Sequence, residues 1–143
     1  MPAPAHPPIG LHLSRVARSV SRAFDSALAE AGGSMPVWLI LISIKTRALG
    51  NQQELADAVG IRGATLTHHL NAMEADGLVR RRRDPTNRRV QQVELTEAGE
   101  AVFSRLRAAA AAFDGRLRRG LTDVDTATLA GLLDRLVGNV ADT

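Results

Sequence analysis

The residues best suited to chemistry in this 143-residue chain are arginines that gather in one short stretch. Residues 80–96 hold six arginines and only two acidic residues, Asp84 and Glu94, so the stretch has a net charge of +4. The whole chain has a net charge of +3, and the remaining residues therefore sum to −1. A basic stretch on a nearly neutral body predicts a local anion-binding element, with nucleic acid as the leading candidate.

Other kinds of chemistry find little support. The chain has no cysteine, which excludes disulfides, thiolate metal sites and cysteine nucleophiles. No Ser-His-Asp arrangement, buried carboxylate pair, phosphate loop or dinucleotide fingerprint stands out, so we predict neither an enzyme nor a bound cofactor. His68 and His69 are adjacent on one helix and diverge, and no other residues have metal-ligand spacing. We therefore expect no metal site.

Targeting patterns are absent as well. No run of 18 apolar residues occurs, and the proline-rich residues 1–10 lack the basic start and apolar core of a secretory signal. These features predict a cytoplasmic protein with no membrane partner.

The arginine stretch is surrounded by elements that apolar periodicity predicts. Four helices are expected before residue 76, the fourth from about Gly63 to Ala75. Two strand-like runs follow, residues 78–83 and 90–95, separated by the turn signal Asp84-Pro85-Thr86-Asn87. Thr96 and Thr122 are placed to cap two final helices. The expected fold class is mainly α with a small β-hairpin (α+β), in which a winged helix-turn-helix core is flanked by N- and C-terminal dimerisation helices.

The expected organisation has four parts. Residues 1–9 are predicted to form an extended arm, and residues 10–50 the N-terminal helices, which serve dimerisation and begin the core. Residues 51–96 are predicted to be the winged helix-turn-helix DNA-binding domain, and residues 97–143 the C-terminal dimerisation helices. Since a single amphipathic helix cannot bury its own apolar stripe, the terminal helices predict a homodimer.

The predicted fourth helix has the pattern of a recognition helix. Leu66, Leu70 and Met73 form its apolar stripe, which leaves the opposite face free to enter a major groove of duplex DNA. Small residues on that face allow close approach, and polar ones can hydrogen-bond to base edges. The predicted recognition residues are Ala64, Thr65, Thr67, His68 and Asn71.

The predicted hairpin would lie along the DNA backbone, with its tip near an adjacent minor groove. The predicted wing and backbone contacts are Arg62, Arg81, Arg83, Asn87, Arg88 and Arg89. Neighbouring strand residues point to opposite sides, so the arginines of residues 80–83 cannot all face DNA. A solvated strand edge is the alternative interpretation of that run.

The segment QELADAVGIRGATLTHHLNAMEADGLVRRRRDPTNRRVQQVELTEAG, residues 53–99, resembles the DNA-binding core of the MarR (multiple antibiotic resistance regulator) family. Residues 9–38 are similar to the family's first helix and the turn after it, with Trp38 at the usual tryptophan position. The resemblance implies a homodimer that binds a pseudo-palindromic double-stranded operator, usually as a repressor. It also implies release by a small, often aromatic and anionic compound. Asn87 departs from the family, which usually has Asp there to orient the wing arginine.

The sequence leaves alternatives open for the place where an effector binds and for the function of the winged helix. Trp38 is most simply a core residue. Alternatively, it lies beside an effector pocket in which His12 and Arg15 bind a carboxylate group of the effector. The winged helix could instead be a protein-interaction module, or a constitutive architectural DNA binder without an effector. A steep negative salt dependence of DNA binding distinguishes a DNA reader from a protein-contact module.

Overall fold

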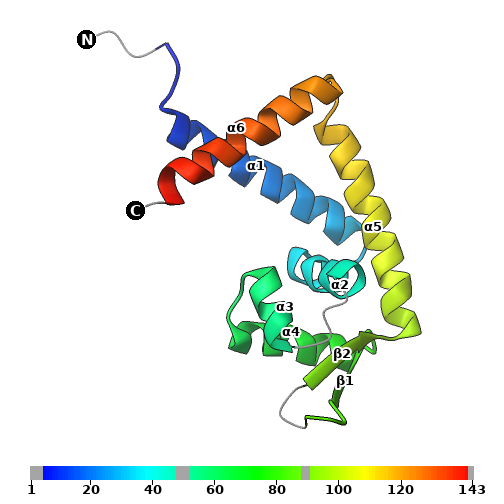
Figure 1. Cartoon of the computed structure of the whole chain (residues 1–143). Helices are drawn as coiled ribbons and strands as arrows, with labels where there is room; N and C mark the ends of the chain where they lie inside the picture. The colour runs from blue at the N-terminus through cyan, green and yellow to red at the C-terminus, as the bar shows by residue number, and fades with distance from the viewer. Residues whose placement is uncertain (1–4, 48–51, 88–90, 142–143) are drawn as a thin grey trace. The chain divides into compact units, whose positions relative to one another are not determined.

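The computed structural model describes residues 5–47, 52–87 and 91–141 of the chain (Figure 1). By their contacts these residues belong to two compact units, residues 1–110 and residues 111–143. The described elements follow the order α1 (Ile9–Glu30), α2 (Met35–Arg47), α3 (Gln52–Val59), α4 (Gly63–Ala75), β1 (Val79–Arg83), β2 (Gln91–Leu95), α5 (Glu97–Leu117) and α6 (Asp123–Ala141). The expected mainly α fold with one small hairpin is confirmed. The four-part division predicted from the sequence stays a prediction.

Three helices begin with capping hydrogen bonds, and the two starts predicted from Thr96 and Thr122 are confirmed among them. The Val37 N–H donates to Ser34 Oγ over 3.4 Å, and the Gly99 N–H donates to Thr96 Oγ1 over 3.1 Å. At α6, Thr122 and Asp125 exchange backbone N–H to side-chain oxygen bonds of 2.9 and 3.0 Å. This reciprocal pair is a capping box, which satisfies donors that a helix start otherwise leaves open.

The core of the first unit is built around α2. This helix is apolar almost all round, and it contacts α1, α3, α4 and β2. Its Ile40 and Leu41 side chains are fully buried, and the predicted stripe of α4 is buried beside them. The other elements contribute the buried side chains Leu28, Trp38, Leu55, Ala56, Val79, Val93, Phe103 and Leu106. One apolar core therefore fixes the helix-turn-helix pair against the hairpin (Figure 1).

The strands β1 and β2 form an antiparallel pair, with Val79 opposite Leu95, Arg81 opposite Val93 and Arg83 opposite Gln91. Val79 and Val93 are buried, which anchors the base of the hairpin in the core. The alternation of sides along β1 therefore gives Arg81 a different face from Arg80 and Arg82.

The start of α5 is locked onto the turn between α4 and β1. The Thr96 N–H donates to the Leu78 carbonyl over 3.0 Å, and the Thr96 hydroxyl donates to the Gly77 carbonyl. A Cβ atom on Gly99 would overlap the Leu78 carbonyl oxygen. Position 99 therefore accepts only glycine without movement of this backbone.

Several helices present apolar side chains to the surface. None of the described residues of α6 is buried, and its Val124, Leu129, Leu132, Val137 and Val140 are 49–74% exposed. In the first unit, α1 exposes Ile9, Leu11, Leu13 and Val16. Contiguous exposed apolar surface is typical of a site of association.

None of the described helices is long and apolar enough by itself to cross a membrane. The helices α1 and α2 meet that requirement only when joined, and they are bent by 79° at their junction.

Candidate nucleic-acid interface

The outward face of α4 carries the side chains that the sequence predicts for recognition. Ala64, Thr65, His68 and Asn71 are exposed, whereas Thr67 is half-buried. The residue before the helix, Arg62, is also exposed and has extended backbone, with no side-chain hydrogen bond capping the start of α4. A face of small and polar side chains of this kind can approach a groove of duplex DNA closely.

The half-buried Thr67 joins the two helices of the helix-turn-helix pair. Its hydroxyl donates to the Gly63 carbonyl over 2.9 Å and accepts a hydrogen bond from Gln52 Nε2 over 2.8 Å. Gln52 belongs to α3, so this contact fixes α3 against α4. The helical spacing placed Thr67 on the outward face but carried no information about the glutamine that packs beside it.

The two histidines of α4 differ in exposure. His68 is exposed and His69 is half-buried, with their ring centroids 5.7 Å apart and the planes inclined by 61°. Among the described residues, no group of three His, Cys, Asp or Glu side chains could hold a metal ion.

Arg81 lies on the inner side of β1 and is bound to α4. Its Nη2 donates to Glu74 Oε1 over 3.0 Å and to Asn71 Oδ1 over 2.5 Å, and its side chain is only 17% exposed. The Arg81 backbone N–H donates to the other carboxylate oxygen, Glu74 Oε2, over 3.0 Å. The side-chain and backbone hydrogen bonds from Arg81 hold the pKa of the Glu74 carboxyl below its ordinary value. The recognition helix and the wing are thus joined by charge-assisted hydrogen bonds.

Sequence reasoning did not find Glu74 as part of this site. Glu74 lies in the last turn of α4 and contacts a strand residue seven positions later, a pairing for which no local spacing rule exists. The predicted phosphate contact of Arg81 stays a prediction.

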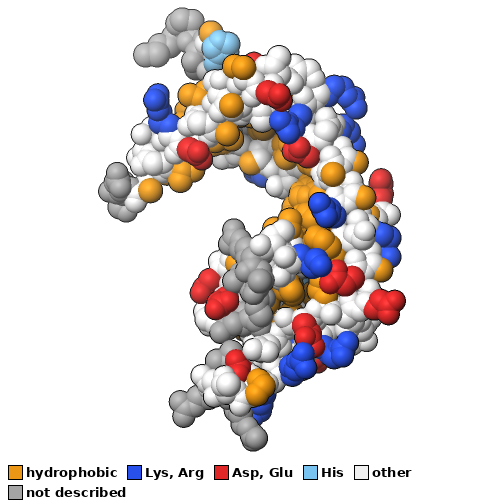
Figure 2. Space-filling view, turned by 45° about the vertical axis from the view of Figure 1, so that its right-hand side comes forward, with side chains coloured by type: hydrophobic (Ala, Val, Ile, Leu, Met, Phe, Trp, Pro, Cys, Tyr) orange, Lys and Arg blue, Asp and Glu red, His pale blue; other side chains and the backbone are white. Residues whose placement is uncertain are grey.

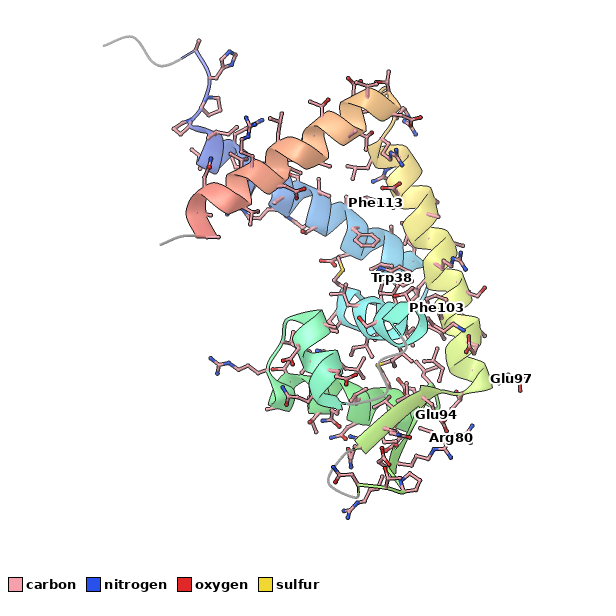
Figure 3. The ribbon with its side chains drawn as sticks, viewed as in Figure 1. Trp38, Arg80, Glu94, Glu97, Phe103 and Phe113 are labelled. Atoms are coloured by element: carbon pink, nitrogen blue, oxygen red, sulfur yellow. The ribbon has the colours of Figure 1, made fainter. Side chains whose placement is uncertain are left out.

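The outer side of the hairpin carries Arg80 and Arg82. Arg82 Nη2 donates to Glu94 Oε2 over 2.7 Å, and Arg80 lies opposite Glu94 in the strand register (Figure 3). Both arginines are exposed, so the ion pair of Arg82 with Glu94 contributes little to stability. Figure 2 shows basic side chains at the lower end of the molecule, where the hairpin lies, with acidic side chains beside them.

The turn of the wing is ordered by Asp84. Its Oδ1 accepts the Thr86 N–H over 2.8 Å and the Thr86 hydroxyl over 2.6 Å, while its Oδ2 accepts Gln92 Nε2 over 3.1 Å. These bonds, led by the Thr86 hydroxyl, hold the pKa of the Asp84 carboxyl below its ordinary value. The Asp-x-Thr spacing is a sequence signature of such a turn, and it offers a source of wing order that does not need an acid at position 87.

The tip of the wing is described only in part. Arg83 and Asn87 are exposed. The predicted contacts Arg88 and Arg89 lie outside the described residues.

A cavity of about 250 Å³ lies between α2 and the first half of α5. Trp38 and Phe103 stack at its wall, with ring centroids 5.9 Å apart and planes inclined by 13° (Figure 3). Lys45 lies 5.8 Å from the Phe103 centroid and is paired with Glu100 over 2.9 Å. The residues that line the cavity are Trp38, Ile42, Lys45, Thr46, Phe103 and Arg107.

Trp38 is buried and also lines this cavity, and its role beside an effector stays a prediction. His12 and Arg15 are exposed on α1 and do not line this cavity. The cations that do line it, Lys45 and Arg107, come from two helices far apart in the chain, which local sequence patterns do not connect.

Residues 34–90 match the model of the MarR family. The chain is 27% identical over 136 residues to a Thauera aromatica protein that is named as a proposed transcriptional regulator of the hcr operon, with 94% of this chain and 82% of that protein covered.

Two solved structures show the same architecture. CouR from Rhodococcus jostii RHA1 bound to p-coumaroyl-CoA is 29% identical with a TM-score of 0.76, covering 90% of each chain. A transcriptional repressor CouR bound to a 23-mer DNA duplex is 26% identical with a TM-score of 0.81, covering 91% of this chain and 92% of that one. The MarR family model thus covers α3, α4 and β1, and the likeness to solved structures runs along most of the chain, which has the winged-helix fold of MarR-family transcriptional regulators.

Proposed function

We propose that this protein is a dimeric, sequence-specific DNA-binding repressor. The observation that carries the proposal is the joint between α4 and β1, where Arg81 binds both Glu74 and Asn71. These contacts fix the arginine-bearing hairpin relative to α4. The exposed face of α4 carries small and polar residues. A helix and a wing held in this way suit a major groove and the neighbouring backbone of duplex DNA.

The proposed contacts divide by chemistry. In the proposed complex Thr65, His68 and Asn71 reach base edges, and Ala64 permits close approach of α4. The guanidinium groups contact phosphates and the adjacent minor groove, which gives affinity but little sequence information. These backbone contacts are proposed for Arg62, Arg83, Asn87, Arg88 and Arg89. Arg81 acts mainly by holding the wing.

Dimerisation is supported by exposed apolar surface. The apolar side chains of α1 and of α6 remain open in a single chain, and association with a second copy would cover them. Two recognition helices related by a two-fold axis require half-sites about one helical turn apart, roughly 34 Å. The expected operator is therefore pseudo-palindromic.

Release by a small ligand is supported by the cavity beside Trp38. Two aromatic rings and two cationic side chains line it, which suits a flat, anionic aromatic group. CouR, a relative of similar fold, has been solved with p-coumaroyl-CoA. In the proposed mechanism the ligand favours a dimer in which the two recognition helices have the wrong separation for two successive grooves.

The test is selection of duplexes from a random pool by the full-length protein, followed by affinity measurements at several salt concentrations. We expect one pseudo-palindromic sequence to be enriched. Replacement of Arg88 and Arg89 by alanine should lower its affinity and flatten the salt dependence. The control, Arg118→Ala with Arg119→Ala, removes the same charge from the second unit.

Three outcomes would contradict the proposal. Equal binding of all duplexes would favour an architectural DNA protein. Absence of DNA binding by the folded dimer would favour a protein-contact module. Unchanged binding by the Arg88 and Arg89 variant would remove the wing from the interface.

A further inference from the structure

The Asn71 side chain on the recognition helix is already engaged within the protein. Its amide oxygen Oδ1 accepts a hydrogen bond from Arg81 Nη2 over 2.5 Å. Asn71 is exposed on the face of α4 that we propose for base contacts, so the engaged oxygen and the DNA-facing surface belong to one side chain.

The chemistry of the pair fixes which end of the amide faces Arg81. A guanidinium group has five N–H donors and no acceptor, so only the amide oxygen of Asn71 can bind it. The amide NH₂ group is then the end left for a partner outside the protein. The hydrogen-bond donors and acceptors of the two side chains are sufficient for this assignment.

Arg81 is itself held in place. Both carboxylate oxygens of Glu74 accept hydrogen bonds from Arg81, one from the backbone N–H and one from Nη2, each over 3.0 Å. The guanidinium is mostly buried, with 17% of the side chain exposed. Turning the Asn71 amide would place its NH₂ against this fixed cation, a contact of donor with donor. Glu74 and Arg81 therefore act as positioning residues for Asn71.

From this geometry we infer that Asn71 is a donor-only reader that selects a hydrogen-bond acceptor in the major groove, best supplied by guanine. An unengaged asparagine pairs with adenine through both ends of its amide, accepting from N6 and donating to N7. Here the amide oxygen is held toward Arg81, so the donating NH₂ end is the one available to a base. Guanine presents two adjacent acceptors, O6 and N7, whereas cytosine presents only the N4 donor at its edge. The inference rests on the proposed function and specifies the base class that one residue of the interface reads.

The experiment uses the full-length protein and the duplex selected by the wild type. Each guanine and adenine of a half-site is replaced in turn by its 7-deaza analogue, which removes the N7 acceptor and retains base pairing. Wild type, Asn71→Ala and Asn71→Asp are titrated on every duplex. The aspartate variant keeps an oxygen for Arg81 and removes the donor, and thermal melting checks that each variant is folded.

We expect one guanine in each half-site at which the 7-deaza analogue weakens wild-type binding about tenfold and leaves Asn71→Ala binding nearly unchanged. In a repeat selection, Asn71→Ala should lose the guanine preference at that position alone. Glu74→Gln tests whether Glu74 and Arg81 position Asn71, because a residue that only stabilises the fold would not change the base preference. By loosening Arg81 it should shift the preference at the same position from guanine toward adenine.

The inference would be overturned if Asn71 of the wild type recognised the N6 amino group of an adenine. Such recognition requires the amide oxygen of Asn71 to face DNA. Absence of any base coupled to Asn71, in a protein that selects a sequence, would overturn it as well. If the wild type selects no sequence at all, the proposed function fails, and that failure is visible before any Asn71 variant is made. Should a variant not fold, Asn71→Ser provides the same removal of the amide.

Discussion

Glu74 and Arg81 are joined by two hydrogen bonds of 3.0 Å, one to each carboxylate oxygen, so the last turn of the recognition helix is clamped to the first strand of the wing. Seven residues separate them in the sequence, with the Gly77 turn between. Through this contact, the position of α4 on the core determines the orientation of the wing. It also makes that orientation sensitive to the charge of one carboxylate.

The first prediction concerns pH. Hydrogen bonds from the Arg81 side chain and backbone lower the pKa of Glu74, so the clamp contributes stability above the ordinary Glu pKa of about 4.3 and loses it as the pH falls through the lowered value. We expect Glu74→Gln to melt at a lower temperature than the wild type at pH 7, and the difference to shrink as the pH falls below about 4. Thermal melting followed by circular dichroism across this range measures it. A difference that stays constant with pH would show that the charge of Glu74 has no part in the clamp.

The second prediction concerns the start of α5. Gly99→Ala places a methyl group against the Leu78 carbonyl, which also accepts the Thr96 N–H. The backbone there must shift, and we expect a loss of about 2 kcal/mol or more in unfolding free energy. Gly115→Ala in the same helix is the matched control, because nothing lies within 4 Å of its Cβ position. The control should be neutral or stabilise by up to about 1 kcal/mol, since alanine favours helix. Urea unfolding compares the two, and equal stabilities would refute the close packing at Gly99.

The elements that carry the site follow from local signals in the sequence. Apolar residues at three- and four-residue spacing predict the helices, and caps such as Thr122 with Asp125 mark where they begin. The alternation along β1 correctly indicates that the arginines 80–83 divide between two sides.

The side-chain contacts of the site do not follow from such signals, because they join elements that meet only in the folded chain. Helical spacing cannot show that Gln52 covers Thr67 or that Arg81 occupies the Asn71 oxygen. The cavity is a similar case. Trp38 was a candidate from its position in the chain, while Phe103 and Arg107 join it only because α5 packs on α2.

The third prediction concerns the cavity. Trp38 is the single tryptophan of the chain and stacks on Phe103 at the cavity wall, so its fluorescence reports on occupancy. We expect benzoate or cinnamate to change this fluorescence saturably, and their neutral amides to bind more weakly. Arg107→Ala should lower the affinity for the carboxylates several-fold and leave the affinity for the amides unchanged, because it removes one of the two cations that line the cavity. Equal binding of acids and amides would contradict an anion site.

The fourth prediction concerns association. Leu132 on α6 is 52% exposed in the single chain, so Leu132→Asp should cost the folded monomer little. If this apolar face joins two copies, the substitution should convert a dimer to a monomer in size-exclusion chromatography with light scattering. Asp134→Ala, an exposed position two residues later in α6, is the control and should remain dimeric. A dimer that survives Leu132→Asp would place the association elsewhere.

The central claim is that the surface formed by α4 and the hairpin reads duplex DNA. Its most direct test is the affinity of the full-length wild type for its selected duplex and for a scrambled duplex of the same composition, measured by fluorescence anisotropy over a range of salt. The account predicts tighter binding of the selected duplex by about a thousandfold or more, with log affinity falling against log salt at a slope steeper than about −4. Equal affinity for the two duplexes, or affinity that does not change with salt, would contradict it.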